Sequence, residues 1–384
     1  MDLRIFFDPL SDDLCKDKED ASLFGTNIRT FTTEFPELGK ISVALFSVSE
    51  DRGSITNKGA SKGADEIRRK LYALKKGSVK LQTADLGNLR SGETVEDTYL
   101  RIKEVCEMLM QLNILPIIIG GSQDLDFGQF LSYENTGKLI SMLNVDAFID
   151  MSGSRDDQSK HHIHRILVHQ PNIIFNYSHL AYQTYLNDQE VINVLEKLHF
   201  EAYRIGRIRE GLIDMEPVVR DADMVSFDVS AIRQTDAPGN KNSQSFGLTG
   251  EEACMLCWYA GLSTKLTSIG FYEYNPEEDI KGQTAGVIAT MIWYFMEGYN
   301  TRKEDIDLSS PQYTKYLVSI ETGSGKLVFY KNTFTEKWWM EVPYPEGKTK
   351  LARNSIVPCS YNDYLMANKG EIPDRWILTQ AKLI

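Results

Sequence analysis

The residues best suited to chemistry in this chain are two carboxylates, Asp146 and Asp150, at the end of an apolar run. The run, residues 139–145, reads Leu-Ile-Ser-Met-Leu-Asn-Val and predicts a strand that is covered on both faces. Two carboxylates that lie close together and partly out of water raise each other's pKa unless a cation lies among them. The pattern therefore predicts a metal ion, a guanidinium or an ammonium group at the tip of this strand.

Predicted strands and helices alternate from residue 41 to residue 300, and they position these carboxylates. Apolar runs typical of buried strands also cover residues 41–46, 79–85, 115–119, 224–228 and 266–272. Helical patterns cover residues 94–112, 249–260 and 284–299, and a further helix begins near residue 64. This alternation predicts an α/β fold with a mostly parallel sheet sandwiched by helices in three layers.

Polar clusters follow four of the predicted strands. In an open parallel sheet, ligands bind beyond the carboxyl ends of the strands. The clusters at these ends are Gly120–Asp124, Asp146–Asp150, Asp228–Asp236, and Glu273 with Asn275. We therefore expect one site that draws side chains from all four clusters.

The pattern divides the chain into three parts. Residues 1–40 are polar and mixed and are expected to wrap around a main domain of residues 41–300. Residues 301–384 form a C-terminal extension, in which strand-like runs flank Thr-Gly-Ser-Gly-Lys and predict a hairpin. The adjacent Trp338 and Trp339 are expected to be buried against a neighbouring element. Residues 154–187 match no pattern that assigns them a role.

Charge and composition narrow the class of partner. A net charge of -12 and an isoelectric point near 5.1 argue against nucleic-acid or anionic-membrane surfaces and favour small cationic ligands. The best candidate for a membrane span, residues 285–299, is too short and contains Glu297. The N-terminus lacks the pattern of a signal peptide, and five scattered cysteines favour reduced thiols. We therefore expect a cytoplasmic protein.

The four polar clusters resemble motifs of the ureohydrolase family, which includes arginases, agmatinases and formimidoylglutamases. The family's Gly-Gly-Asp-His-Ser is similar to Gly-Gly-Ser-Gln-Asp at residues 120–124, and its Asp-Ala-His-x-Asp to Asp-Ala-Phe-Ile-Asp at 146–150. Its Ser-Phe-Asp-x-Asp-x-x-Asp-Pro resembles Ser-Phe-Asp-Val-Ser-Ala-Ile-Arg-Gln at 226–234, and its Glu-x-Asn-Pro matches 273–276. The order and spacing of these motifs imply the family's fold from about residue 40 to about residue 300.

The departures from these motifs fall on metal ligands. The resemblance implies two manganese ions held by two histidines and four aspartates. Three of the six positions keep aspartate (Asp146, Asp150, Asp228) and three carry other residues (Gln123, Phe148, Ser230). Phenylalanine cannot bind a metal ion, and serine is a poor ligand for a divalent ion unless it is deprotonated. We therefore expect no cofactor; the alternative is one Mn²⁺ or other divalent cation on the three aspartates and Gln123.

Further residues are assigned roles around this site. Arg233 stands where the third motif has its last aspartate, and its guanidinium is hypothesised to neutralise the carboxylates in place of metal. Asp124 is the candidate for a catalytic base, with a helix N-cap as the alternative. Phe148 is expected to fill the pocket. The residues expected to contact a ligand are Glu273, Asn275, Arg233, Phe148 and Ser230.

Two cysteines and a group of histidines invite functional interpretations that we do not favour. Residues 161–169 contain four of the six histidines, and in a strand His162 and His164 would share one face. Because the segment itself contains no carboxylate or cysteine, we expect a polar structural face and not a metal site. Cys254 and Cys257 lie in an apolar helix and are expected to pack in the core.

Three functional interpretations follow from the residues and the resemblance. The one we favour is a ureohydrolase-fold pseudoenzyme that has lost the binuclear manganese centre and binds a ligand or a partner. The second is an active hydrolase of amidine or guanidine C–N bonds, in formimidoylglutamate, agmatine or arginine, that uses a single metal. The third is a metal-free binding module for a guanidino or polyamine cation. The family commonly assembles as trimers or hexamers, so the resemblance also allows a homo-oligomer.

Overall fold

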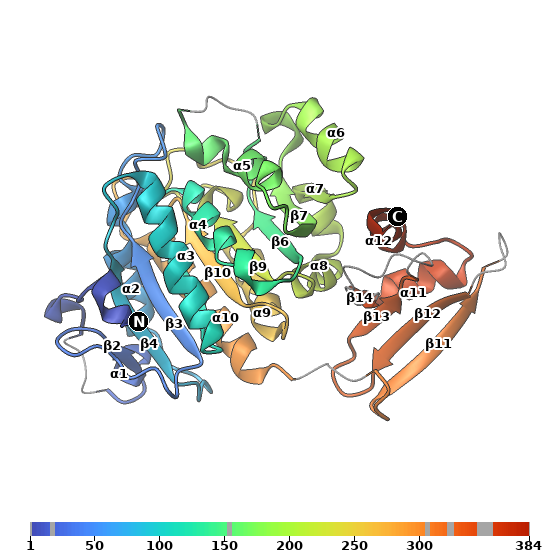
Figure 1. Cartoon of the computed structure of the whole chain (residues 1–384), viewed down its shortest axis with the longest axis horizontal. Coiled ribbons are helices and arrows are strands. Elements are labelled where there is room, and N and C mark those ends of the chain that lie inside the picture. The colour runs from blue at the N-terminus through green and yellow to red at the C-terminus, as the bar shows by residue number, and fades with distance from the viewer. Residues whose placement is uncertain are drawn as a thin grey trace.

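The computed structural model describes residues 2–15, 20–151, 156–303, 308–320, 326–343 and 356–383. Figure 1 shows a large α/β domain with a smaller lobe at one side. The lobe, called here the C-terminal lobe, comprises the described residues from 308 to 383. No helix in the described ranges is long and apolar enough to cross a membrane.

The main domain is built on a 10-stranded sheet in the order β1-β4-β3-β5-β10-β9-β6-β7-β8, with β2 also paired to β4. Its pairings are parallel except that of β1 with β4. The strands are β1 (Phe7–Asp8), β2 (Ile28–Thr30), β3 (Val43–Val48), β4 (Thr83–Leu89), β5 (Leu115–Ile119), β6 (Ile140–Val145), β7 (Ile174–Tyr182), β8 (Glu201–Arg204), β9 (Met224–Asp228) and β10 (Ser268–Tyr272). The predicted mostly parallel sheet is therefore confirmed.

Helices cover both faces of this sheet. Alternate residues of β3 point to opposite faces: Val43 and Leu45 join one apolar core, whereas Ala44 and Phe46 join the other. The helices over the first core are α2 (Ala64–Ala73), α7 (Ile205–Glu210), α8 (Glu216–Arg220), α9 (Gly250–Leu262) and α10 (Gln283–Thr301), with the short α1 (Phe24–Asn27) beside α2. The helices over the second core are α3 (Val95–Gln111), α4 (Asp126–Leu131), α5 (His162–Val168) and α6 (Gln189–Lys197). The three-layer prediction is thus confirmed.

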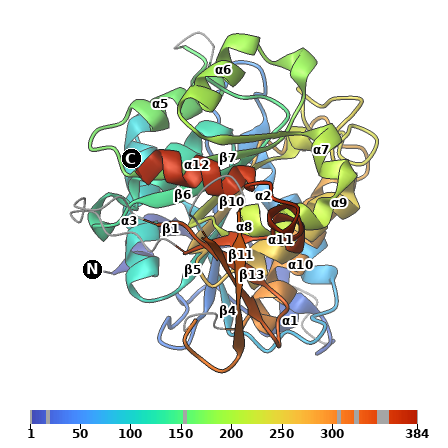
Figure 2. The ribbon, with the colours of Figure 1, turned by 90° about the vertical axis from the view of Figure 1, so that its right-hand side faces the viewer.

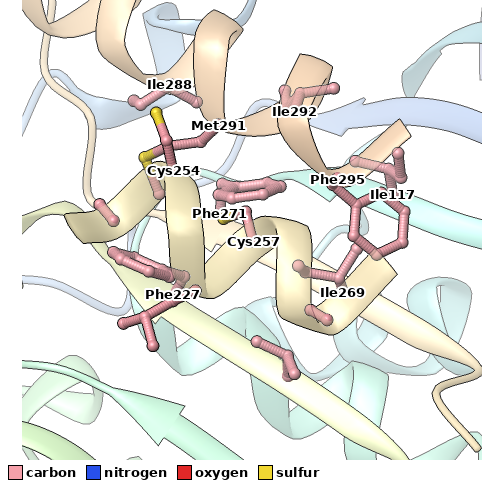
Figure 3. Close-up of a cluster of buried hydrophobic side chains, with 14 of the residues drawn as sticks. Ile117, Phe227, Cys254, Cys257, Ile269, Phe271, Ile288, Met291, Ile292 and Phe295 are labelled. Carbon is pink, nitrogen blue, oxygen red and sulfur yellow. The ribbon is translucent and has the colours of Figure 1, made fainter. Parts of the chain in front are cut away.

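Local sequence sets where the main helices begin. The side chains of Thr94 and Thr249 each accept a hydrogen bond from the backbone N–H three residues later. In return, the side chains of Asp97 and Glu252 accept from the backbone N–H groups of these threonines, which makes both helix starts capping boxes. Such caps stabilise a helix by about 1 kcal/mol. Cys254 and Cys257 of α9 are buried among apolar side chains of α10 and of β5, β9 and β10, as Figure 3 shows. Their predicted role in core packing is confirmed.

The structure differs from the predicted elements at three places. The N-terminal segment does more than wrap around the domain, because β1 and β2 pair with β4 in the main sheet. The strand expected at 79–85 begins later, at Thr83, and runs to Leu89. The unassigned region contains α5 and β7, and the histidine-rich segment is the helix His162–Val168 and not a strand. A short run of mixed apolar and polar residues does not by itself distinguish helix from strand.

The C-terminal lobe has its own sheet and core. Its antiparallel strands lie in the order β11-β12-β13-β14 and are followed by two helices. These elements are β11 (Tyr313–Ser319), β12 (Lys326–Asn332), β13 (Trp338–Glu341), β14 (Ile356–Cys359), α11 (Tyr361–Asn368) and α12 (Asp374–Leu383). The predicted hairpin is confirmed in β11 and β12, although its turn at 321–325 lies outside the described residues.

The lobe docks on the main domain through tryptophan and arginine side chains. Trp338 and Trp339 are buried, as predicted. The Arg220 guanidinium at the end of α8 lies over the Trp339 ring at 4.4 Å and donates to the Trp338 carbonyl at 3.0 Å. Lys382 of α12 donates to the Asn176 side chain, near the start of β7. The lobe therefore sits at the amino ends of the strands, and Figure 2 views the molecule from this side.

Candidate carboxylate site

The predicted polar clusters meet at the carboxyl ends of four adjacent strands. In the order of the sheet these strands are β5, β10, β9 and β6. Gln123 follows β5, Glu273 follows β10, Asp228 ends β9 and Asp146 follows β6. All four side chains are buried. The parallel topology thus gathers residues that lie far apart in the chain into one site.

Asp146 and Asp228 accept hydrogen bonds from residues that replace the family's metal ligands. The Ser230 hydroxyl donates to Asp146 Oδ1 at 2.6 Å, and the Ser230 backbone N–H donates to Asp228 Oδ1 at 2.6 Å. Gln123 lies between both carboxyl groups. In the amide orientation that pairs donors with acceptors, its nitrogen lies 3.1 Å from Asp146 Oδ2 and 3.3 Å from Asp228 Oδ2. Ser230 therefore acts as a donor to both carboxyl groups. Gln123 lies within hydrogen-bond distance of both, and in its other orientation, with Nε2 donating to Asn144 Oδ1 at 2.8 Å and to Ser226 Oγ at 3.1 Å, it turns its amide oxygen toward them.

Phe148 and Asp150 are the more exposed members of the site. Both side chains are partly accessible to solvent, and that of Asp150 is 14% exposed. The Phe148 backbone N–H donates to Asp146 Oδ1 at 3.0 Å, which fixes the turn after β6. The Phe148 ring offers no ligand atom in place of the family's histidine.

Glu273 and Asn275 are committed to contacts inside the protein. Glu273 has a positive φ of 67°, and its two carboxyl oxygens accept from Asn57 Nδ2 at 2.7 Å and from the Gln123 backbone N–H at 2.8 Å. Asn275 donates to Asn57 Oδ1 at 3.1 Å and to the Lys58 carbonyl at 2.9 Å. Both residues are buried, so in this structure they hold the loop after β3 against the site.

Asp124 is not a helix N-cap. The N-cap before its 3₁₀ turn is Ser122, and α4 begins at Asp126. The Asp124 carboxyl is buried and accepts from the Tyr99 hydroxyl at 2.5 Å. A Cβ atom at Gly53 would lie 2.2 Å from Asp124 Oδ2, so the loop backbone can approach this closely only because residue 53 is glycine. Asp124 therefore lies beneath this loop.

The hypothesis for Arg233 does not match the geometry. Its Nε atom lies 3.0 Å from Asp236 Oδ1, and its side chain is 40% exposed. Asp236 also accepts from the Gly250 backbone N–H at the start of α9. In this structure Arg233 thus pairs with a loop carboxylate near the surface, and the expected neutralisation of the buried carboxyl groups by its guanidinium is wrong.

A histidine that the sequence analysis set aside lies among the carboxylates instead. His162 is buried, with Nδ1 2.8 Å from Asp126 Oδ1 and Nε2 3.7 Å from Asp150 Oδ2. Burial alone would lower the pKa of this imidazole, but Asp126 and Asp150 raise that pKa well above its ordinary value. His162 is therefore a cationic partner of the cluster. The run of histidines in the sequence could have indicated a functional residue, but the carboxylate partners of His162 lie in other segments, and the helix that carries His162 was not predicted.

The carboxyl groups themselves hold protons more tightly than exposed ones. Burial raises the pKa of Asp146 well above its ordinary value, and the charges of Asp228 and Asp150 add to this effect. Burial likewise raises the pKa of Asp228 to about 7. Burial also raises the pKa of Asp124, and that of Glu273 well above its ordinary value. Like charges in a buried site cannot all be ionised without a cation.

Comparisons with known proteins agree with the fold and the motifs. A model of the arginase family matches residues 41–297. The chain belongs to this family. The predicted membership of the ureohydrolases is thereby confirmed, while the C-terminal lobe lies outside the matched residues.

The similar proteins of the arginase family include several formimidoylglutamases. Those of Streptococcus gordonii and Macrococcus caseolyticus are 23% and 26% identical over 279 and 265 residues, which cover 67% and 66% of this chain and 84% of each relative. The solved formimidoylglutamase of Bacillus subtilis has a TM-score of 0.65 and 22% identity, and the match covers 71% of this chain and 91% of that one. The formiminoglutamase of Trypanosoma cruzi with Mn²⁺ has a TM-score of 0.63 and 20% identity, and the match covers 70% and 100% of the two chains. At this identity the solved structures establish the fold.

The residues of this chain do not fit the pair of manganese ions that the arginase family implies. Phe148 has no ligand atom, and the Ser230 hydroxyl directs its proton at Asp146. The Gln123 amide spans Asp146 and Asp228. Within the part of the chain that the structure describes, no three histidine, cysteine, aspartate or glutamate side chains are grouped to hold a metal ion. A hydroxyl donor at Ser230 and an aromatic ring at Phe148 thus stand where the binuclear centre needs ligands.

Proposed function

We propose that this arginase-family protein has lost the binuclear manganese centre and acts as a pseudoenzyme that binds a ligand or a partner. The observation that carries the proposal is the 2.6 Å hydrogen bond from Ser230 Oγ to Asp146 Oδ1. Metal ions bridged by these aspartates would need the carboxylate lone pair to which the Ser230 hydroxyl donates. Ser230 therefore supports a closed, metal-free arrangement, and Phe148 supplies no ligand atom.

The loss of metal bears directly on the chemistry. Two metal ions can generate a hydroxide nucleophile at neutral pH and polarise the bond that is cleaved. Asp146, Asp228 and Asp124 are buried carboxyl groups with raised pKa values and do not supply such charge. We therefore propose no hydrolytic step for this chain.

The ligand class that we propose is a small guanidino or amine cation. Its support is that, among the described residues, the carboxyl groups of the site outnumber the basic side chains, with the His162 imidazole facing Asp126 and Asp150. Asp150 and Phe148 are the members that solvent reaches, so they are suited to meet the charged and apolar parts of such a ligand.

Metal content tests the loss of the binuclear centre. The purified chain is incubated with excess Mn²⁺ near neutral pH, desalted and analysed for manganese per chain. The matched control combines Gln123→His, Phe148→His and Ser230→Asp, which restores the family's ligand types. We expect manganese in this variant and none at stoichiometric level in the natural chain. Two ions per natural chain, or manganese-dependent hydrolysis of formimidoylglutamate, agmatine or arginine, would contradict the proposal.

Thermal shift measurements test the ligand class separately. A compound that binds only the folded state raises the Tm in proportion to the logarithm of its concentration above Kd. We expect agmatine, arginine or a polyamine to raise the Tm of the natural chain in metal-free buffer. Asp150→Asn should abolish the shift. If no guanidino compound or amine shifts the Tm, the cationic ligand is wrong, whereas the metal measurement still decides the loss of the centre.

A further inference from the structure

The outer strand of the C-terminal lobe, β11, presents an unprotected edge. It pairs with β12 in unbroken register over all seven of its residues, from Tyr313 opposite Asn332 to Ser319 opposite Lys326. On its other side, β11 pairs with no strand among the described ranges. The Tyr313 N–H donates to the Ser310 carbonyl at 3.0 Å, whereas from Lys315 to Ser319 the backbone groups that face away from β12 pair with no other strand of the described ranges. Figure 1 shows β11 on the side of the lobe away from the main domain.

The opposite edge of the same sheet is closed. β14 contains Pro358, whose carbonyl accepts from Arg375 Nη1 at 3.2 Å. The Cys359 carbonyl accepts from Arg220 Nη2 at 3.4 Å. Proline and side-chain donors at an edge prevent pairing with another chain. The two edges of one small sheet thus differ: one is sealed against the main domain and the other is open.

The side chains of β11 do not block pairing. The strand has no proline, glycine or bulge, and Lys315 is its single charged residue. Leu317, two residues after Lys315, is 59% exposed and lies opposite Val328 of β12 on the same face of the sheet. Natural proteins usually protect an edge of this length with several charges, a proline or a bulge. An exposed leucine beside an open backbone edge marks a surface for strand addition.

We propose that β11 pairs antiparallel with β11 of a second copy of this chain, joining the two lobes into one continuous sheet. A two-fold axis at Tyr316 places Lys315 opposite Leu317 of the second copy and Thr314 opposite Val318 of the second copy. No like charges then face each other directly, and the stem of Lys315, whose ammonium lies 5.4 Å from the centroid of the Tyr330 ring in its own chain, lies beside the exposed leucine of the other copy. The strand is therefore complementary to itself, as an isologous two-fold interface requires.

The position of the lobe leaves room for this pairing. The lobe is joined to the main domain by hydrogen bonds. Arg220 of α8 donates to the Trp338 carbonyl, Lys337 of the lobe donates to the carbonyl of Leu262 at the end of α9, and Lys382 of the lobe donates to Asn176 of β7. These contacts involve β13, β14 and α12 and leave β11 outside them. The proposed dimer forms through the lobe and requires nothing of the carboxylate site.

The proposal is tested by measuring the mass of the full chain in solution, for the natural sequence and for variants that change the charges on β11. The natural chain is measured by light scattering and sedimentation over a concentration series, and we expect dimers of twice 43.7 kDa, or larger assemblies of an even number of chains. Leu317→Lys places a lysine opposite Lys315 of the second copy and is expected to halve the mass. Lys315→Glu combined with Leu317→Lys creates two opposite-charge pairs and is expected to restore it.

Ile377→Lys on α12 is the matched control, since this residue is also exposed but lies off the edge strand. Circular dichroism and Tm establish that each variant is folded. The proposal is overturned if the natural chain is monomeric throughout the series, if Leu317→Lys leaves the mass unchanged, if Ile377→Lys dissociates the dimer equally, or if the double variant stays dissociated.

Discussion

Replacing His162 by glutamine removes a cationic side chain that contacts both Asp126 and Asp150. His162 and Asp126 are 1% and 0% exposed in their side chains, and the joining atoms are 2.8 Å apart. Asp126 Oδ2 has no hydrogen-bond partner within the described residues, so the lost charge is not compensated there. Breaking a buried ion pair by removing one partner typically costs about 3–5 kcal/mol. For a domain of this size that corresponds to a fall in Tm of at least about 6 °C.

The measurement is urea unfolding of the natural and His162→Gln chains, followed by circular dichroism at pH 8. Glutamine keeps an amide donor for Asp126, so the difference reports mainly the charge. His169→Gln is the matched control: His169 lies 2.6 Å from Glu134, but Glu134 keeps its ion pair with Lys103. We expect at most about 1 kcal/mol for this partly exposed pair. If His162→Gln costs no more than His169→Gln, the reasoning that His162 is the cation of the cluster fails.

Three further predictions concern the site and the lobe. Ser230→Ala removes the donor to buried Asp146 and should lower the free energy of unfolding by about 1–3 kcal/mol in urea titrations, whereas an unchanged midpoint would contradict the hydrogen bond. Metal-free protein should be more stable at pH 5.5 than at pH 8. The pKa of Asp228 in the folded state, about 7, exceeds its ordinary 3.8, so the folded state binds more protons than the unfolded state and the free energy of unfolding falls as pH rises toward 7. The raised pKa of His162 acts in the same direction. A urea midpoint that rises over this interval would refute the assignment. Arg220→Ala should loosen the lobe and expose Trp339, giving red-shifted tryptophan emission and faster proteolysis near residue 303, with Arg209→Ala as the exposed control.

Much of the fold could be predicted because its signals are local. The apolar run at 115–119 and the run at 224–228 are the observed strands β5 and β9, and Thr94 and Thr249 mark helix starts through caps within three residues. The convergence of Asp146, Asp228, Gln123 and Glu273 followed from one rule, that parallel strands present their carboxyl ends at one edge.

The partners within the site could not be predicted in the same way. His162 pairs with Asp126, which lies on a helix from an earlier crossover, and no spacing in the sequence encodes that contact. Arg233 stands within a ligand motif, yet its side chain turns to Asp236, three residues on, because a local ion pair near solvent avoids the cost of burying a guanidinium. The donor role of Ser230 toward Asp146 likewise requires the packed ends of β6 and β9. Tertiary packing decided the contacts of His162 and Ser230, and a local ion pair decided that of Arg233.

The C-terminal lobe is anchored at the starts of the strands, while the acidic residues gather where the strands finish. If both proposals hold, one chain would engage two molecules at once without steric competition between them. An assembly joined through the lobes would present its carboxylate sites in pairs, so a multivalent target would be held by avidity even where each single contact is weak.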